Sequence, residues 1–274
     1  MQTAAEARWR PPSRPVAAGA GARAGRARSA APILEPRAGG RAQQVAAALG
    51  GVHPALAFLV VLLAGFAAVT AISTLLGLFV VHVLVGGLGL GGADNSLTQS
   101  LAGDRTATWT DLSAIGSAIG GAPVLPIVAA LVALAAAFAR QWRIAAFAAC
   151  ALPLESAAYR VTATIVQRDR PGVVRLEDLP VAHSYPSGHT AASVAVYCGL
   201  ALLLTSRIAD RAARAAIWAV AIALVAGVAL SRMYRGMHHP LDVAGGVVVG
   251  VLAVAVTVFA CRVAGAVAAD RSGR

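Results

Sequence analysis

The sequence predicts an all-α protein, a bundle of six transmembrane helices. Hydrophobic residues make up 58% of the 274 residues and charged residues only 13%, whereas a soluble domain carries roughly 25% charged residues. The mean hydropathy is +0.72. Apolar runs recur along the chain, and most are long enough for the ~20 residues that a membrane-spanning helix needs. This composition disfavours the alternative of a soluble helical protein rich in Ala and Val.

Six apolar runs are predicted to cross the membrane: 55–84, 120–139, 144–166, 187–204, 215–230 and 241–261. The third run is the least uniform, because it contains Pro153, Glu155 and Arg160. The glycine-rich polar segment 86–113 separates the first two runs, and a short interfacial helix is expected near 96–101.

The two ends of the chain differ from this apolar region. Residues 1–50 carry eight Arg against two Glu and lack the apolar residues of a core, so we predict a disordered, Arg-rich cytoplasmic tail. Residues 51–265 are predicted to form the six-helix membrane domain, and 266–274 a short cytoplasmic tail. The net charge is +11, but Trp9 is the tail's one aromatic residue. We therefore expect membrane lipids, and no nucleic acid, as its partners.

The positions of the arginines predict the orientation in the membrane. All 23 basic residues are Arg; with a cytoplasmic N-terminus, sixteen lie on the cytoplasmic side, six on the opposite side, and Arg160 lies within the third run. Cytoplasmic loops are normally the more positive. We therefore expect a multi-pass protein of the cell membrane with both termini in the cytoplasm. Three polar segments, at the ends of the last four runs, then lie together on the extracytoplasmic face.

The first polar segment, 168–171, reads Arg-Asp-Arg-Pro and follows the third run. Arginine is permanently charged and its fork of N–H donors matches phosphate oxygens. The alternative interpretation is a pair of arginines that reach from the membrane edge into water.

The second polar segment, 184–190, reads Ser-Tyr-Pro-Ser-Gly-His-Thr and leads into the fourth run. Gly188 allows a phosphate to approach the backbone closely, and Ser187 offers a hydroxyl donor. His189 is a residue type suited to general acid catalysis near neutral pH. The alternative is a helix N-cap followed by an interfacial histidine.

The third polar segment, 231–242, contains Arg232, a further candidate phosphate ligand, and two adjacent histidines. His238 and Asp242 are four residues apart near the start of the sixth run. We expect Asp242 to contact one imidazole nitrogen of His238, which leaves the other free as a nucleophile. His239 points elsewhere and is taken as a structural neighbour.

Together these residues resemble the type 2 phosphatidic acid phosphatase (PAP2) family, the membrane relatives of bacterial acid phosphatases and vanadium haloperoxidases. The family pattern is Lys, six residues, Arg-Pro; then Pro-Ser-Gly-His; then Ser-Arg, five residues, His, three residues, Asp. This chain has Arg170-Pro171, the tetrapeptide 186–189, and Ser231-Arg232 followed by His238 and Asp242 at the family spacing. The motifs cover 170–242, and the six-span layout extends the resemblance over about 51–265.

The resemblance implies a hydrolase of phosphoric monoesters or pyrophosphates that needs no metal and no cofactor. It implies a catalytic set of His238 as nucleophile, forming a phosphohistidine, with Asp242 and the general acid His189. It implies a phosphate-binding set of Arg170, Ser187, Gly188 and Arg232. The expected substrate is a lipid phosphate of the phosphatidic acid, phosphatidylglycerol phosphate or undecaprenyl pyrophosphate class.

One position departs from the family pattern. The Lys falls at Ala163, which cannot contact a phosphate. Arg160, about one helical turn away, and Arg168 are further candidate phosphate ligands. The alternative for Arg160 is that Glu155 neutralises its charge. The alternative function is a non-hydrolytic lipid-phosphate binder or transporter. Binding requires arginines but no nucleophile, so the histidines favour the enzyme.

Overall fold

The computed structural model describes residues 31–178 and 182–272; residues 1–30 of the predicted tail lie outside the described part. Every regular element in the described ranges is helical, which confirms the predicted all-α class. In chain order, the α-helices are α1 (Arg41–Ala48), α2 (Pro54–Phe79), α3 (Gly91–Gly103), α4 (Ala107–Ile119), α5 (Val124–Phe138), α6 (Trp142–Val166), α7 (Gly188–Ser193), α8 (Gly199–Thr205), α9 (Arg211–Tyr234) and α10 (Pro240–Ser272). A 3₁₀ turn, Pro32–Leu34, precedes them. The π-helical segments Val80–Gly87 and Val194–Cys198 extend α2 and join α7 to α8.

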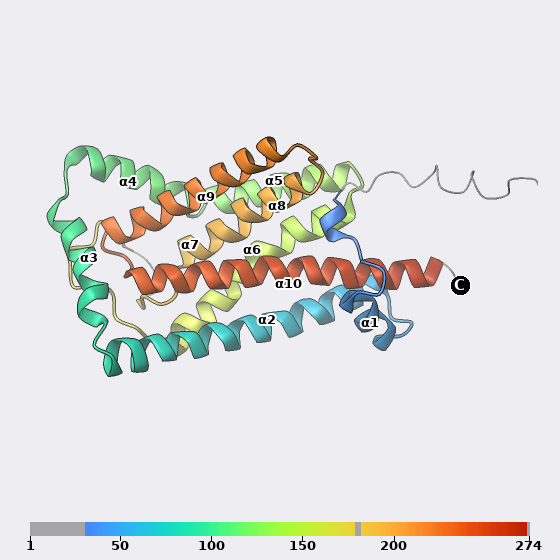
Figure 1. Ribbon diagram of the computed structural model, residues 1–274, viewed down its shortest axis with the longest axis horizontal. Helices are drawn as coiled ribbons and strands as arrows, with labels where there is room; N and C mark the ends of the chain where they lie inside the picture. The colour runs from blue at the N-terminus through green and yellow to red at the C-terminus, as the bar shows by residue number, and fades with distance from the viewer. Residues whose placement is uncertain (1–30, 179–181, 273–274) are drawn as a thin grey trace, which may run out of the picture.

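Six helical segments of the described chain are long and apolar enough to cross a membrane, as predicted. They are Pro54–Gly87, Ala107–Phe138, Trp142–Val166, Gly188–Thr205, Arg211–Tyr234 and Pro240–Ser272. The helix α10 runs along the middle of the bundle and packs against α2, α6 and α7 (Figure 1). The helix α9 packs on α4, and α5 packs on α6.

Different helices and loops lie at the two ends of the bundle. The helix α3 lies across one end, where α10 begins, and α1 lies at the other end, beside the last turns of α10 (Figure 1). The loops that carry the three polar segments follow α6 and α9 and precede α7 and α10. They therefore lie at the α3 end, away from both described termini.

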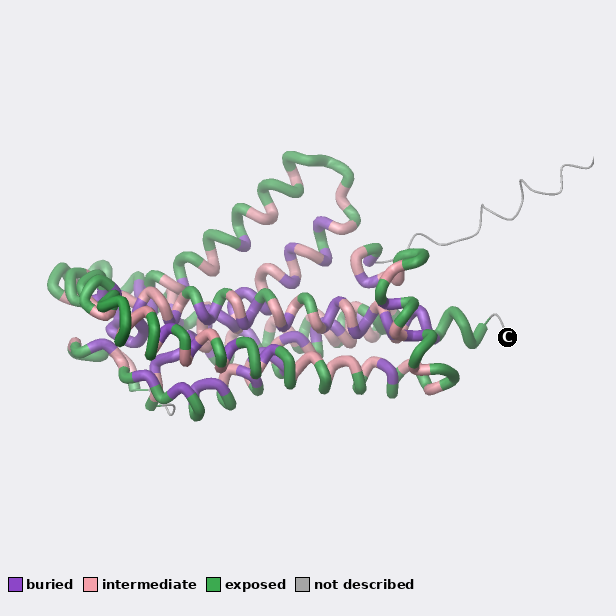
Figure 2. Tube along the Cα trace, turned by 60° about the horizontal axis from the view of Figure 1, so that its bottom comes forward, coloured by how far each residue is buried: buried purple, intermediate pink, exposed green. Residues whose placement is uncertain are grey.

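Burial is concentrated inside the bundle, while the outward faces are exposed (Figure 2). Many exposed side chains are large and apolar, such as Leu75 at 68% and Phe138 at 87% exposure. In a protein that spans a membrane, lipid covers such faces, so the apolar side chains need no protein partner.

The second membrane span differs from its predicted boundaries. The sequence predicted a run over 120–139, but the structure places α4 before it, in residues assigned mostly to the polar segment 86–113. The small residues of α4 allow it to approach α9 closely: a Cβ on Gly116 would lie 3.0 Å from the Ser231 Cβ, and one on Gly120 only 2.3 Å from a Val228 methyl. Such close approach stabilises helix pairs in membranes.

The structure also differs from the prediction of disorder up to residue 50. Within the described part of that segment, α1 packs on α10, and Ala42 and Ala46 are buried against Val263 and Ala266. The sequence did not predict this short helix, because the many arginines of residues 1–50 outweigh its few apolar residues. At the other terminus, α10 continues to Ser272, through much of the predicted tail 266–274.

Close packing of α10 against α7 depends on glycine. A Cβ on Gly250 would lie 2.5 Å from the Ala191 carbonyl oxygen, whereas one on Gly227 in α9 would meet nothing within 4 Å. We expect Gly250→Ala to destabilise the protein by about 1–3 kcal/mol through overpacking. Gly227→Ala is the matched control and should leave the melting temperature in detergent unchanged or slightly higher. Equal melting temperatures for the two variants would contradict this packing.

Candidate active site

The three polar segments meet at the α3 end of the bundle. The Ser184 amide donates to the Arg168 carbonyl at 2.7 Å, which closes the loop between α6 and α7. The Ser187 amide donates to the Asp242 carbonyl at 2.9 Å, and an Arg170 Nη1–H donates to the Met237 carbonyl. Hydrogen bonds thus join each segment to another, and the site residues are held in one place by backbone contacts.

Both histidines of the predicted catalytic set line one pocket of about 370 Å³. This volume is within the range of small-molecule sites. Gly188 lines it beside His189, and His238 lines it from the loop before α10. The remaining lining residues come from the α4–α5 junction, α6 and α7: Gly120, Gly121, Ala122, Leu125, Pro126, Leu152, Glu155, Ser156, Tyr159, Arg160 and Ala192.

The ring of His238 is buried and oriented by a carbonyl group. Its side chain is 2% exposed, and Nδ1 lies 2.7 Å from the Ser184 carbonyl oxygen. A carbonyl only accepts, so Nδ1 carries the hydrogen and Nε2 of the neutral ring keeps its lone pair. Burial lowers the pKa of His238 well below its usual value; Asp242 opposes this, and the charges of Arg170 and Arg232 add to it.

Asp242 does not contact His238 as the sequence predicted. Its carboxylate instead accepts from the Ser184 hydroxyl and from the backbone N–H of His239 at 2.8 Å. His239 precedes the first turn of α10, so Asp242 acts as the acidic residue of a capping arrangement. Besides its charge effect, Asp242 reaches the His238 ring through Ser184, whose hydroxyl binds Asp242 and whose carbonyl binds the ring. His239, predicted to be a structural neighbour, is the histidine that touches Asp242.

Arg168, a candidate phosphate ligand, lies between two carboxylates. It is 8% exposed and pairs with Asp242 at 2.5 Å and with Asp94 of α3. Burial alone would lower its pKa, but the charges and hydrogen bonds of these two carboxylates raise it. Asp94 also accepts from the Leu241 amide at 3.0 Å, at the start of α10. Arg168 is therefore an internal counter-ion that ties α3 to α10, and phosphate binding falls to other residues.

Arg232 has unused hydrogen-bond donors. Its side chain is fully buried, and Nη1 donates to Ser117 of α4 and to Glu177 at 2.5 Å. Its Nε and Nη2 groups have no hydrogen-bond partner among the described residues. Buried N–H groups are normally paired, so these donors are suited to bind an anion. Neither Ser117 nor Glu177 belongs to a motif, and sequence reasoning gave no reason to single them out.

Glu177 joins two arginines at this end of the bundle. It pairs with Arg232 and, at 2.5 Å, with Arg235. Burial alone would raise the pKa of Glu177, but its hydrogen bonds and the nearby positive charges lower it. The carboxylate is thus an anionic partner for both arginines.

The other predicted phosphate ligands differ in exposure. Arg170 is half-buried, and its Nε donates to the Ala182 carbonyl at 3.1 Å. Ser187 is fully buried, with its hydroxyl 3.0 Å from that of Thr190, and it does not line the pocket. Gly188 packs on an aromatic ring: a Cβ there would lie 2.9 Å from Cζ of Tyr159. Only glycine fits between this ring and the pocket.

His189 lies beside the break between α4 and α5. A Cβ on Gly121 would come 2.9 Å from the His189 Nε2, so this glycine leaves room at the nitrogen. The charges of Arg170 and Arg232 act on both His189 and His238. The two rings therefore share one pocket and one positive field.

Ala163, which stands where the family pattern has a lysine, is fully buried in α6. Arg160 is exposed and lines the pocket that contains both histidines. It remains a candidate cation for a substrate phosphate.

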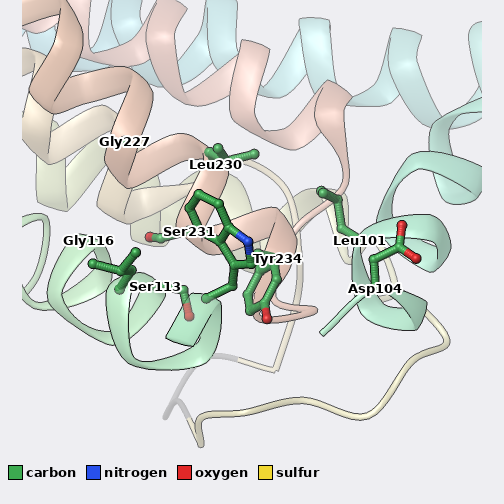
Figure 3. A pocket seen from close by; sticks show the side chains of 10 residues that line it. Leu101, Asp104, Ser113, Gly116, Gly227, Leu230, Ser231 and Tyr234 are labelled. Atoms are coloured by element: carbon green, nitrogen blue, oxygen red, sulfur yellow. The ribbon is translucent and has the colours of Figure 1, made fainter. Parts of the chain in front are cut away.

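A second pocket of about 410 Å³ lies between α4 and α9 (Figure 3). Its lining is mostly apolar and includes Leu101, Leu112, Leu230 and Tyr234. Of the motif residues only Ser231 reaches it. Gly188, His189 and His238 line the first pocket instead, whereas Arg170 and Arg232 are not among its lining residues.

Comparison with known proteins finds a family for the region that contains the three polar segments. The sequence profile of the PAP2 superfamily matches residues 145–263. This part of the chain is therefore similar to the PAP2 superfamily. The matched region includes all three polar segments, and the predicted enzyme class, a PAP2-type phosphatase, is confirmed.

Two solved structures resemble this chain. A transmembrane PAP2-type phosphatidylglycerolphosphate phosphatase from Bacillus subtilis aligns with a TM-score of 0.58 and 19% identity, over 74% of this chain and 93% of that one. LpxE from Aquifex aeolicus aligns with a TM-score of 0.46 and 22% identity, over 59% and 92%. The first likeness confirms the fold. No curated protein matches this chain in sequence.

The ion pairs of Arg168 predict a large effect on stability. Arg168→Met leaves the buried Asp94 and Asp242 without their counter-ion and should cost about 3–5 kcal/mol. Arg175→Met, in the same loop but exposed, is the matched control and should change stability by less than about 0.5 kcal/mol. Thermal unfolding in detergent compares them, and similar melting temperatures would show that the cluster is not stabilising.

The lowered pKa of His238 predicts activity under mildly acidic conditions. Because the folded protein disfavours the charged ring, His238 stays neutral and nucleophilic as the pH falls through about 6.5, where a free histidine becomes protonated. We expect kcat/KM, measured between pH 5 and 8 and corrected for ionisation of the substrate phosphate, to show no decrease on the acidic side near pH 6.5. A decrease near pH 6.5 that moves to higher pH in the Arg170→Gln variant would mean that His238 titrates normally.

Proposed function

We propose that this chain is an integral-membrane phosphatase that hydrolyses a lipid phosphate or pyrophosphate through a phosphohistidine. One observation carries the proposal: the Nδ1 of His238 is bound by a carbonyl, so Nε2 is free in a pocket that also contains His189. A binding protein needs no such oriented imidazole. The Nε and Nη2 groups of Arg232, which have no hydrogen-bond partner among the described residues, favour an anionic substrate.

Phosphate binding falls to two arginines and the backbone at Gly188. The Nε and Nη2 groups of Arg232 are arranged as a fork, which suits two oxygens of one phosphoryl group. Arg170 adds a second positive charge, and both charges act on the histidines. Ser187 supports the turn from inside through Thr190. In phosphoryl transfer such positioned charge stabilises the transition state.

The reaction proceeds in two steps. In the first, Nε2 of His238 attacks phosphorus, the P–O bond to the leaving alcohol breaks, and protonated His189 gives its proton to the leaving oxygen. In the second, His189 takes a proton from water, the water oxygen bonds to phosphorus, and the P–N bond breaks. Free phosphate is released and both rings regain their starting states. Asp242 contributes through Ser184, which holds the His238 ring in its reactive tautomer.

The site lies where an amphiphilic substrate fits. It is at the end of a bundle whose outward faces are apolar, so the acyl or prenyl chains remain in lipid while the phosphate reaches the histidines. Phosphatidic acid, phosphatidylglycerol phosphate and undecaprenyl pyrophosphate all have this form. The membrane domain is proposed to comprise residues 51–265.

The orientation is part of the proposal. The described termini lie at the opposite end of the bundle from the site (Figure 1), as expected if both termini are cytoplasmic and the site faces the extracytoplasmic side of the cell membrane. The arginine distribution favours this orientation.

The histidine mechanism is tested by substitution. His238→Ala should lower phosphate release from a panel of lipid phosphates in detergent by about 10³-fold or more, because the nucleophile is lost. His82→Ala, an exposed histidine outside the site, is the control and should retain activity. Quenching in alkaline denaturant, in which the P–N bond survives, should trap phosphohistidine labelled from the substrate phosphate in the wild type and none in His238→Ala. EDTA should leave the wild-type rate unchanged.

Two results would overturn the proposal. Loss of activity in EDTA with recovery on Mg²⁺ would contradict the metal-free mechanism. Lipid-phosphate binding by the wild type with no release of phosphate from any member of the panel would favour the alternative, a non-hydrolytic binder or transporter.

A further inference from the structure

A carboxylate outside the three polar segments sets how Arg232 is held. Glu177 lies in the loop between α6 and α7, and its Oε2 accepts from Nη1 of Arg232 at 2.5 Å. The Ser117 hydroxyl of α4 accepts from the same nitrogen. Arg232 is fully buried and its guanidinium is planar. Two partners on one nitrogen therefore fix the direction of the whole group.

One edge of the Arg232 guanidinium suits a phosphate. Nε and Nη2 share this edge, and neither has a hydrogen-bond partner among the described residues. Two parallel N–H donors on one edge match two oxygens of a phosphoryl group. Because Glu177 and Ser117 bind Nη1, they hold Arg232 without occupying the edge that is suited to the phosphate.

Arg235 offsets the negative charge of Glu177, so that the charge of Arg232 is not cancelled. Nε of Arg235 lies 2.5 Å from Oε1 of Glu177. The other two nitrogens of Arg235 donate to the Ser113 hydroxyl and to the Leu176 carbonyl, each at 3.0 Å. Protein groups therefore hold Arg235 at all three nitrogens. Two positive charges and one negative charge leave one net positive charge for an anion that binds Arg232.

The two arginines need a carboxylate between them because they are close neighbours at one helix end. Arg232 is in the last turn of α9, and Arg235 is its C-cap residue. Like charges three residues apart on a helix repel each other, and burial strengthens the repulsion. The backbone keeps Glu177 in place, since the Leu176 amide donates to the Arg235 carbonyl at 3.1 Å. Without the carboxylate, we expect Arg232 to turn away from Arg235, which moves its Nε–Nη2 edge.

We infer that Glu177 is a positioning residue, which holds Arg232 so that its Nε–Nη2 edge receives the substrate phosphate. The inference rests on the proposed function, because Arg232 is assigned there as a phosphate ligand. The charges of both Glu177 and Arg232 act on His189, so the pair belongs to the surroundings of the reacting groups. If Glu177 acted only as a nearby negative charge, its removal would strengthen the binding of an anion. A positioning role predicts the opposite sign.

The test measures phosphate binding as well as turnover. Glu177→Gln keeps the size of the side chain but removes its charge. In detergent this variant should raise the Kd of inorganic phosphate by about 10-fold, measured from the rise of the melting temperature with phosphate concentration. It should lower kcat/KM for lipid phosphates by about 10–100-fold. Glu177→Asp, which keeps the charge, should recover part of both losses. Asp178→Asn, at the next residue and exposed, is the matched control and should behave as the wild type.

A double-mutant cycle shows whether Glu177 acts through Arg232. When Arg232→Gln is already present, adding Glu177→Gln should change the Kd of phosphate by less than about 2-fold, because the side chain that it positions is gone. Tighter phosphate binding by Glu177→Gln, or losses that multiply in the double variant, overturns the inference. Wild-type hydrolysis of lipid phosphates would leave the proposed function intact in either case. No hydrolysis of any lipid phosphate would instead overturn the proposed function, and the Kd of phosphate would still decide whether Glu177 positions Arg232.

Discussion

The structure around the site depends on the compensation of one buried negative charge. Asp242 is fully buried, and its carboxylate is satisfied by Arg168, by the Ser184 hydroxyl and by the His239 amide. These partners come from the two ends of the loop between α6 and α7 and from the residue before α10. Removing Arg168 would leave the buried carboxylate without its counter-ion. The need to neutralise Asp242 therefore holds the three segments together, and through Ser184 it sets the tautomer of His238.

The arginines of the motifs divide into two physical roles. Arg168 is surrounded by carboxylates and acts as an internal counter-ion, whereas Arg232 keeps two donor groups without partners. The difference follows from what each meets in space: Asp94 reaches Arg168 from α3, while Arg232 faces Ser117 and Glu177. A guanidinium that is already paired adds rigidity, and one with spare donors is able to bind an anion. Phosphoryl transfer requires hydrogen-bond donors that are free to bind the phosphate and are held rigidly in place.

Small residues bring this polar cluster into a helical bundle. Glycines at positions 120, 188, 246 and 250 lie where a Cβ would overlap a neighbouring helix or ring. They allow α4, α7 and α10 to approach their neighbours closely, and two of them, Gly120 and Gly188, line the pocket. Burial in such a bundle makes a carboxyl oxygen without a partner costly, and Oε1 of Glu155 has none among the described residues.

The sequence by itself determined the class of fold, the number of spans and the motif residues, because apolar length and residue spacing are local properties of the chain. It placed His189 and His238 near each other only through family resemblance and the order of the spans. Tertiary structure alone decided that Ser184, not Asp242, holds His238, that Arg168 is internal, and that α4 joins the second span. It also revealed Ser117, Glu177 and Glu155 at the site. The reason is physical: hydrogen-bond partners and burial are set by helices far apart in sequence, and no spacing within one segment encodes them.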